Sequence, residues 1–169
     1  MKATVKRIKL TTLASAVLSA GLVMSNAVYA GGTTALTVNA KISGVCKVTT
    51  APGTLDFGTI DPSGAANATA TTTFVMKCSN GTTSAAATDD NGLNFSVTKR
   101  MQHTVAGNFL PYAIAYVNDT GFSGAGFAAA AATRTITING TITPAQYAGA
   151  LATIGAQIYA DTVTITVNP

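Results

Sequence analysis

Hydrophobic and polar residues alternate near the start of the chain, from Thr34 to Cys46 (T-A-L-T-V-N-A-K-I-S-G-V-C). One side of an extended backbone here carries only apolar side chains, those of Leu36, Val38, Ala40 and Ile42. A period of two predicts a β-strand with one buried face. No turn follows that could fold this strand back into a hairpin, so nothing adjacent in the sequence buries the face.

The same alternation recurs in short segments between turn-forming residues such as D-P-S-G at Asp61 and D-D-N-G at Asp89. We expect strands at residues 54–60, 71–78, 93–99, 110–117, 134–142 and 161–167. The expected inward positions are Leu55, Phe57, Thr59, Phe74, Met76, Cys78, Leu93, Phe95, Val97, Leu110, Tyr112, Ile114, Tyr116, Ile136, Ile138, Ile142, Val163, Ile165 and Val167. Threonine, which is β-branched and tolerates water, fills many of the outward positions. The pattern predicts an all-β domain, an antiparallel sandwich.

Two segments depart from the alternation. Residues 128–132 are alanines with high helix propensity, but the glycines before them favour a loop or a single turn. Residues 144–156 either begin a short helix at Pro144 or form an irregular connection.

The first thirty residues have the features of a secretory signal peptide. Lysines and an arginine precede an apolar stretch, and Val28 and Ala30 occupy the small-residue positions before a cleavage site. A membrane anchor is the alternative, but the apolar stretch is short and rich in Ala, Ser and Thr. Cleavage after Ala30 leaves residues 31–169, a length that suits one domain.

Removing the signal peptide changes the charge balance. Four of the ten Lys and Arg residues lie in it, so six remain against six Asp residues and the mature chain is neutral. A neutral chain offers no basic surface for a phosphate backbone, so we expect no nucleic-acid partner.

Cys46 and Cys78 are the only cysteines. In an exported chain, such a pair favours a disulfide, which would stabilise the fold by about 3–4 kcal/mol. A metal or redox pair is the alternative. However, zinc needs more ligands than these two cysteines and the single His103, and redox pairs usually have C-x-x-C spacing.

The sequence offers little for catalysis, and we expect no catalytic, cofactor-binding or metal-binding residues. His103 lies in a polar stretch without a nucleophile motif nearby, which predicts an exposed loop residue. Asp119-Thr120-Gly121 matches a tripeptide of aspartic peptidases, but Asp and Gly are also ordinary turn residues. Asp89 and Asp90 lack the spacing of a calcium loop and are expected in a solvated turn.

Several segments together resemble the spore coat protein U domain family, which includes subunits of archaic chaperone–usher pili. They are Cys46 after the alternating strand, L-D-F-G-T-I-D at 55–61, F-V-M-K-C at 74–78, K-R-M at 99–101, L-P-Y-A-I-A-Y at 110–116 and Y-A-D-T-V-T-I-T-V at 159–167. Two departures stand out. Gln157 occupies a position where the family often has Gly, and the chain ends in Asn168-Pro169 rather than on an aromatic residue.

The resemblance implies an incomplete immunoglobulin-like antiparallel β-sandwich that a donor strand completes. Residues 31–43 would be the N-terminal donor-strand extension, with Leu36, Val38, Ala40 and Ile42 as its buried side chains, and residues 44–169 the pilin domain. Val163, Ile165 and Val167 would belong to the last strand or line the groove that receives the donor. Gly44 is a candidate hinge between donor strand and domain.

The implied partners are neighbouring pilin subunits, a periplasmic chaperone and an outer-membrane usher. The chain would be exported through the periplasm to a fimbrium at the cell surface, for attachment and biofilm formation. The alternative is a secreted coat or matrix protein with a complete sandwich, whose first strand pairs inside its own domain.

Overall fold

The computed structural model describes residues 32–169, so the predicted signal peptide lies outside the described residues. The chain divides into two units, Met1–Asn39 and Ala40–Pro169. In the first unit, residues 32–39 form no helix or strand. Across residues 32–169, no helix has the length and hydropathy that a membrane crossing requires.

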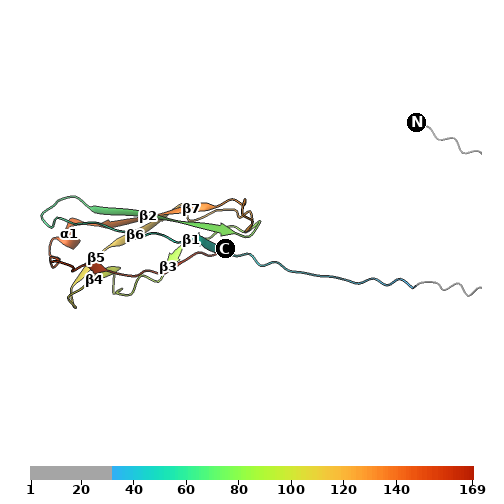
Figure 1. The fold of residues 1–169 in the computed structure, drawn as a ribbon, viewed down its shortest axis with the longest axis horizontal. Helices are drawn as coiled ribbons and strands as arrows, with labels where there is room; N and C mark the ends of the chain where they lie inside the picture. The colour runs from blue at the N-terminus through green and yellow to red at the C-terminus, as the bar shows by residue number, and fades with distance from the viewer. Residues whose placement is uncertain (1–31) are drawn as a thin grey trace, which may run out of the picture. The chain divides into compact units, whose positions relative to one another are not determined.

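The second unit is built almost entirely of β-strands (Figure 1). The elements are β1 (Cys46–Thr50), β2 (Ala68–Cys78), β3 (Thr88–Asp89), β4 (Arg100–His103), β5 (Phe109–Pro111), β6 (Ala113–Val117), β7 (Arg134–Ile142), α1 (Pro144–Tyr147), β8 (Tyr159–Ala160) and β9 (Ile165–Thr166). Every strand pair among them is antiparallel. The predicted all-β antiparallel fold class is therefore confirmed.

The strands of this unit form two layers. One layer is a four-stranded sheet with the order β1-β2-β7-β6. The other contains a two-stranded sheet, β3-β9, and a three-stranded sheet, β5-β4-β8. In Figure 1 the long strands β2 and β7 lie on one side of the unit, with β3, β4 and β5 on the other. This arrangement is the predicted sandwich.

The core between the layers consists of two clusters of buried side chains. Cluster 1 contains Cys46, Phe74, Met76, Cys78, Phe122, Ile136 and Ile138. Cluster 2 contains Leu110, Tyr112, Ile142 and Tyr147. Alternate residues of β2 and β7 supply most of the first cluster, as the period of two predicts.

The strands predicted at 71–78 and 134–142 are confirmed as β2 and β7, with their expected apolar residues buried. The strand predicted at 110–117 is also present but changes layers. Its first part, β5, pairs with β4, and its second part, β6, pairs with β7. Because the switch at Tyr112 preserves the alternation, Leu110 and Tyr112 are buried and Ile114 and Tyr116 are half-buried.

The prediction of a strand at 93–99 is wrong. Residues 93–99 form turns, and Leu93 and Val97 are 77% and 90% exposed. The turn geometry begins at Asn91 and Gly92, which both have positive φ. Alternation alone could not reveal that no neighbouring strand pairs with this segment.

The other departures from an even alternation are local. A short helix does begin at Pro144, where the side-chain Oε1 of Gln146 accepts the N–H of Thr143 (2.7 Å) and caps the first turn. Residues 128–132 form a turn, in which the N–H of Ala131 donates to the carbonyl of Ala128 (2.9 Å). Both observations agree with one of the two outcomes expected for each segment.

Candidate functional site: an apolar groove between two sheet edges

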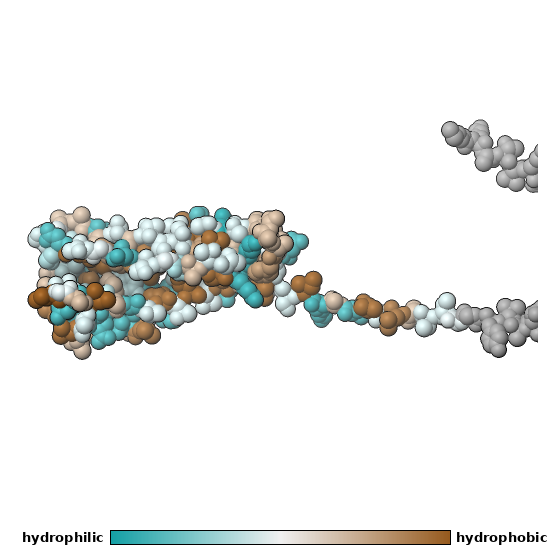
Figure 2. All heavy atoms as spheres, in the orientation of Figure 1, coloured by the Kyte–Doolittle hydropathy of each residue, from teal (hydrophilic) through white to brown (hydrophobic). Residues whose placement is uncertain are grey.

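An open groove of about 360 Å³ lies between the two layers. Its lining is mainly apolar, from Val48, Pro52, Phe74, Val163, Thr164 and Ile165. Val48 belongs to β1 and Ile165 to β9, and each of these strands is at the edge of its sheet. Figure 2 shows apolar residues at the surface along the seam between the layers. The groove therefore separates two sheet edges, one from each layer.

One side of the groove, which we call the C-terminal wall, is residues 161–168. Its outer edge is hydrogen-bonded to residues 85–93. The carbonyls of Thr162, Thr164 and Asn168 accept the N–H groups of Leu93, Asp90 and Ala85 (3.2, 3.1 and 3.0 Å). Because hydrogen-bonding direction alternates along a strand, the main-chain groups of Val163, Ile165 and Val167 face the opposite edge. Within the described part of the chain, no strand lies beside that inner edge.

The other side of the groove, the N-terminal wall, is residues 48–60. It starts with the end of β1, but residues 51–60 belong to no strand and make no backbone–backbone hydrogen bond among the described residues. The strand predicted at 54–60 is therefore absent, although Leu55 and Phe57 do turn inward and are half-buried. Thr59 is exposed and Ile60 half-buried instead, because Gly58 adopts φ 66° and shifts the alternation by one residue.

Both walls pack on the same two core clusters. Leu55, Ile165 and Val167 contact cluster 1, and Phe57, Ile60 and Val163 contact cluster 2. Between them, β7 contributes Gly140, where a Cβ atom would lie 2.6 Å from Cζ of Phe57 and 2.8 Å from Cδ2 of Leu55. Glycine at this position lets the N-terminal wall approach the sheet closely. The groove thus runs over a floor that belongs to both clusters.

The structure places the residues predicted for the last strand along this groove. Val163 and Ile165 line it, and Val167 is half-buried against cluster 1. Only Ile165–Thr166 is a regular strand, much shorter than the predicted 161–167. The difference arises because only one neighbouring segment pairs with the wall, and that segment turns at Asn91 and Gly92.

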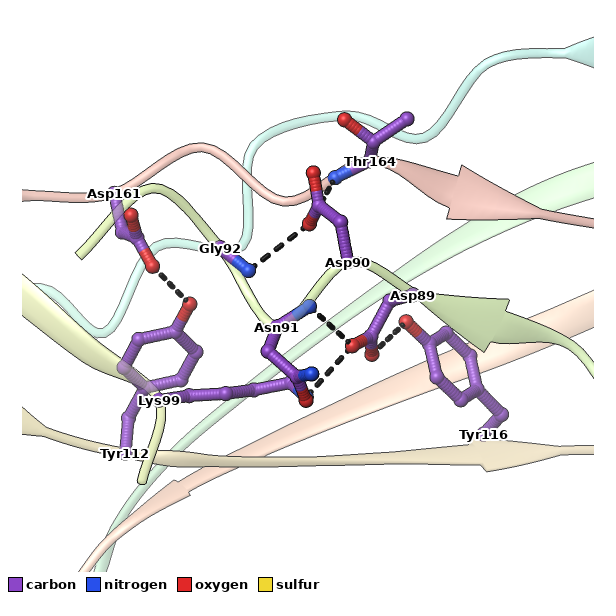
Figure 3. Close-up of polar contacts among 9 residues, drawn as sticks. All are labelled: Asp89, Asp90, Asn91, Gly92, Lys99, Tyr112, Tyr116, Asp161 and Thr164. Carbon is purple, nitrogen blue, oxygen red and sulfur yellow. Dashed lines mark hydrogen bonds and ion pairs between the residues drawn. The ribbon is translucent and has the colours of Figure 1, made fainter. Parts of the chain in front are cut away.

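A polar network surrounds the outer edge of the C-terminal wall (Figure 3). The Asp89 carboxylate accepts a hydrogen bond from the hydroxyl of Tyr116 (2.8 Å) and forms an ion pair with Lys99 (2.7 Å). Burial raises the pKa of the Asp89 carboxyl, but hydrogen bonds from Lys99, Tyr116 and Asn91 outweigh it, so the pKa lies below its usual value. Burial and the neighbouring Asp89 carboxylate raise the pKa of Tyr116. At neutral pH, Asp89 is therefore ionised and Tyr116 is uncharged.

The predicted donor-strand residues lie in the segment before β1. Leu36, Val38 and Ile42 are 85%, 80% and 94% exposed, and Ala40 is exposed as well. Residues 32–45 form no strand. Large aliphatic side chains at every second position thus remain in water within a single chain, which is an unusual arrangement for side chains of this kind.

The predicted disulfide between Cys46 and Cys78 is present and joins β1 to β2. Just before it, the Ser79 hydroxyl oxygen accepts the N–H of Val45 (3.2 Å) and the hydroxyl donates to the carbonyl of Ser43 (3.3 Å). A Cβ atom at Gly44 would lie 2.8 Å from Oγ1 of Thr82. Close packing on Thr82 therefore explains this glycine, and its role as a hinge stays a prediction.

The prediction that His103 is an exposed loop residue is wrong. Its side chain is buried, and the ring packs edge-on against Tyr159. Its Nδ1 atom accepts the N–H of Val105 (2.9 Å). This bond fixes the turn between β4 and β5. Asp119 also has a structural contact, since its carboxylate accepts the N–H of Ala87 (3.0 Å). In residues 32–169, no group of three His, Cys, Asp or Glu side chains could hold a metal ion.

The family model for the Spore Coat Protein U domain matches residues 32–166, nearly all of the described chain. The chain belongs to the spore coat protein U domain family. A search of curated proteins gave no match. Among solved structures, this spore coat protein U domain is similar to a chain of the CsuC–CsuE chaperone–tip adhesion subunit pre-assembly complex from archaic chaperone–usher Csu pili of Acinetobacter baumannii. The TM-score is 0.40 and the identity 17%, over 75% of this chain and 40% of the other. The domain thus spans less than half of that chain.

Proposed function

We propose that this chain is a structural subunit of a chaperone–usher pilus that polymerises by donor-strand exchange. The observation that carries the proposal is the groove, where the unpaired edges of β1 and β9 flank a strip of apolar side chains. An added strand would bond to both edges and join the two layers into one sandwich. Such strand addition takes its affinity from main-chain hydrogen bonds and its register from alternate side chains.

The strand that fits this groove is the extension of a second copy, residues 31–43. Its apolar face has a side chain at every second position, so one strand can place several side chains on a floor that belongs to both core clusters. Burying Leu36, Val38 and Ile42 would contribute about 1.5–3 kcal/mol for each side chain. The groove lining contains no charged side chain, so an apolar strand enters without leaving a charge unpaired. Residues 44–169 are then the pilin domain.

An empty groove with two unpaired edges is an aggregation hazard. The proposal therefore includes a periplasmic chaperone that occupies the groove before assembly, and an outer-membrane usher where the next subunit replaces it. Family membership supports both partners. The fibre would stand at the cell surface, reached through the signal peptide, and serve attachment and biofilm formation.

The donor strand is tested by placing a charge on one face or the other. We expect Val38→Asp and Ile42→Asp to abolish the heat-resistant ladders that wild-type chain forms on an unboiled gel. A carboxylate that enters the groove loses its water without gaining a partner. Asn39→Asp is the matched control, because it introduces the same charge on the polar face of the same segment. Ladders that persist in Val38→Asp and Ile42→Asp contradict the proposal.

The groove is tested by mixing two defective chains. Ile165→Asp damages the groove and keeps the extension, whereas Val38→Asp damages the extension and keeps the groove. Neither chain polymerises alone in this proposal, but together they form a heterodimer with one filled groove and no longer species. Size-exclusion chromatography distinguishes dimers from ladders and from unmixed monomers. A wild-type chain that remains a folded monomer would instead favour the coat or matrix protein with a complete sandwich.

A further inference from the structure

The D-D-N-G turn at Asp89–Gly92 contacts the outer edge of the C-terminal wall with side chains as well as main chain (Figure 3). The Asp90 carboxylate accepts the N–H of Thr164 (2.9 Å), and the main-chain N–H of Asp90 donates to the carbonyl of Thr164 (3.1 Å). The side chain thus replaces a main-chain acceptor and continues the ladder beyond β3. The same Asp90 carboxylate accepts the N–H of Gly92 (2.9 Å), which fixes the turn itself.

Asp161 holds the start of the wall in a similar way. One carboxylate oxygen accepts the hydroxyl of Tyr112 (2.7 Å), and the other accepts the main-chain and side-chain N–H groups of Asn94 (3.3 and 3.2 Å). These contacts attach the wall to Tyr112, where the chain changes layers between β5 and β6, and to Asn94 in the loop after the turn. Gly92 lies in between with φ 87°, and a Cβ atom there would collide with the Asp161 carboxylate.

The regular ladder between β3 and β9 has only two residue pairs. Fixing one residue in an extended conformation costs about 1–2 kcal/mol in conformational entropy, so a wall of this length needs more than those pairs to stay straight. Main-chain bonds from Leu93, Asp90 and Ala85 and the side-chain bonds supply the rest. Asp90 and Asn94 bond from the outer edge, and the Tyr112 hydroxyl bonds to the Asp161 side chain from the core. None of these bonds uses the main-chain groups of Val163, Ile165 or Val167, which face the groove.

We propose that Asp90, Gly92 and Asp161 are positioning residues that hold the C-terminal wall extended, with its inner edge free, before a donor strand arrives. The proposal rests on the donor-strand function stated above and deepens it. A wall that is straight in advance lowers the entropic cost of strand addition, so these residues act on the rate at which the groove is filled. Asp161 belongs to the receiving strand and Asp90 bonds to it from the outer edge, so both act on that strand and not on the donor.

The test uses the full mature chain carrying Val38→Asp, which has an intact groove but cannot fill it with its own extension. This chain is diluted from denaturant into an excess of a fluorescent peptide of residues 32–43, and peptide uptake and release are followed by anisotropy. We expect Asp90→Ala to slow uptake about tenfold, because the charge-assisted hydrogen bonds to Thr164 and Gly92 are lost. Release from the filled groove should change less than twofold, since an inserted strand then holds the wall.

Two variants make this result specific. Asp90→Asn keeps an oxygen that can accept the N–H of Thr164, and we expect it to restore uptake to within about twofold. Asp61→Ala is the matched control, because the Asp61 carboxylate accepts the N–H of Ser63 (2.9 Å) in an equivalent turn that does not contact the wall. Equal slowing in Asp90→Ala and Asp61→Ala, or wild-type uptake in Asp90→Ala, overturns the positioning role.

Hydrogen exchange separates this proposal from the proposed function. In the peptide-free chain we expect Asp90→Ala to speed amide exchange about tenfold at Thr164, with β2 and β7 unchanged. If no peptide binds even when Asp90 is intact, donor-strand exchange is wrong, whereas faster exchange at Thr164 still shows that Asp90 holds the wall. Unchanged exchange at Thr164 overturns the positioning role whether or not peptide binds.

Discussion

The two walls of the groove carry similar alternations of apolar and polar residues, yet the molecule holds them by different means. The N-terminal wall is anchored at one end, where β1 pairs with β2 and the Cys46–Cys78 disulfide crosses between them. Beyond Thr50, one side chain from elsewhere in the fold bonds to its backbone, the Thr72 hydroxyl to the carbonyl of Gly53 (3.2 Å). Within the wall, the Asp56 carboxylate accepts the N–H of Gly58 (2.8 Å). The C-terminal wall is bonded along its whole length.

This difference shows that a strand-like segment can be positioned without a complete ladder, in two ways. The N-terminal wall depends on a covalent anchor and on Leu55 and Phe57 packing over Gly140. The C-terminal wall depends on carboxylates that accept main-chain N–H groups. The C-terminal wall keeps one edge unpaired, whereas the N-terminal wall beyond Thr50 pairs at neither edge. The N-terminal wall should therefore be the softer of the two, because fewer groups fix its backbone.

Removing the disulfide should give the largest effect and act on the N-terminal wall. We expect the double variant Cys46→Ser with Cys78→Ser to lose about 3–4 kcal/mol of stability, since the unfolded chain gains the freedom that the cross-link denied it. Urea unfolding followed by tyrosine fluorescence measures the loss. Reductant is the control, because it should destabilise the wild type equally and leave the double variant unchanged. If amide hydrogen exchange at Thr164 also becomes faster in the double variant, the two walls are not anchored separately.

Adding a methyl group at a glycine of each region should give the next largest effect. Gly58 lies in the N-terminal wall, and Gly92 lies in the turn that contacts the C-terminal wall. Gly58 and Gly92 both have positive φ, 66° and 87°, but a Cβ atom at Gly58 meets nothing within 4 Å, whereas one at Gly92 collides with Asp161. We expect Gly58→Ala to cost about 1 kcal/mol from backbone strain alone. Gly92→Ala should cost about 2–4 kcal/mol, because the Asp161 bonds are displaced as well. Equal losses in urea unfolding would show that the collision is relieved without disturbing the C-terminal wall.

The sequence predicted the parts of this fold in which one chain supplies both partners. β2 and β7 were predictable because they pair with each other in one sheet and bury their alternate residues in the core. The disulfide followed from two cysteines in an exported chain. Segments 54–60 and 93–99 alternate as clearly, but neither forms a strand pair in the described chain. Alternation encodes which face is apolar, not whether a neighbouring strand exists.

The polar groups that position the C-terminal wall were not predictable from the sequence. D-D-N-G reads as a solvated turn, and only the fold brings Asp90 to Thr164 and Asp161 to Tyr112. The signal available was indirect: two adjacent aspartates in a chain with few charges, and a tyrosine on an inward position that needs a partner for its hydroxyl. A carboxylate paired across more than forty residues leaves no local pattern.

Alkaline titration should give the smallest effect and report on the C-terminal wall alone. Burial, followed by the hydrogen bond to Asp161, raises the pKa of Tyr112, and burial together with Asp89 raises that of Tyr116. A tyrosine in the unfolded chain ionises near about pH 10. Because the folded pKa is higher, each hydroxyl contributes its full stability below about pH 10 and loses it as the pH rises toward the folded value.

We therefore expect stability to fall above about pH 10, while phenolate absorbance of the folded chain shows two tyrosines that resist ionisation. Tyr112→Phe and Tyr116→Phe should each remove one resistant group. Neither variant should alter the response of the N-terminal wall to reductant, since neither hydroxyl contacts residues 48–60. Ionisation of all tyrosines together near about pH 10, with the circular dichroism of the fold intact, would mean that the two carboxylates do not hold these hydroxyls in solution. The C-terminal wall would then be held by its main-chain bonds and by Asp90, without the two tyrosines.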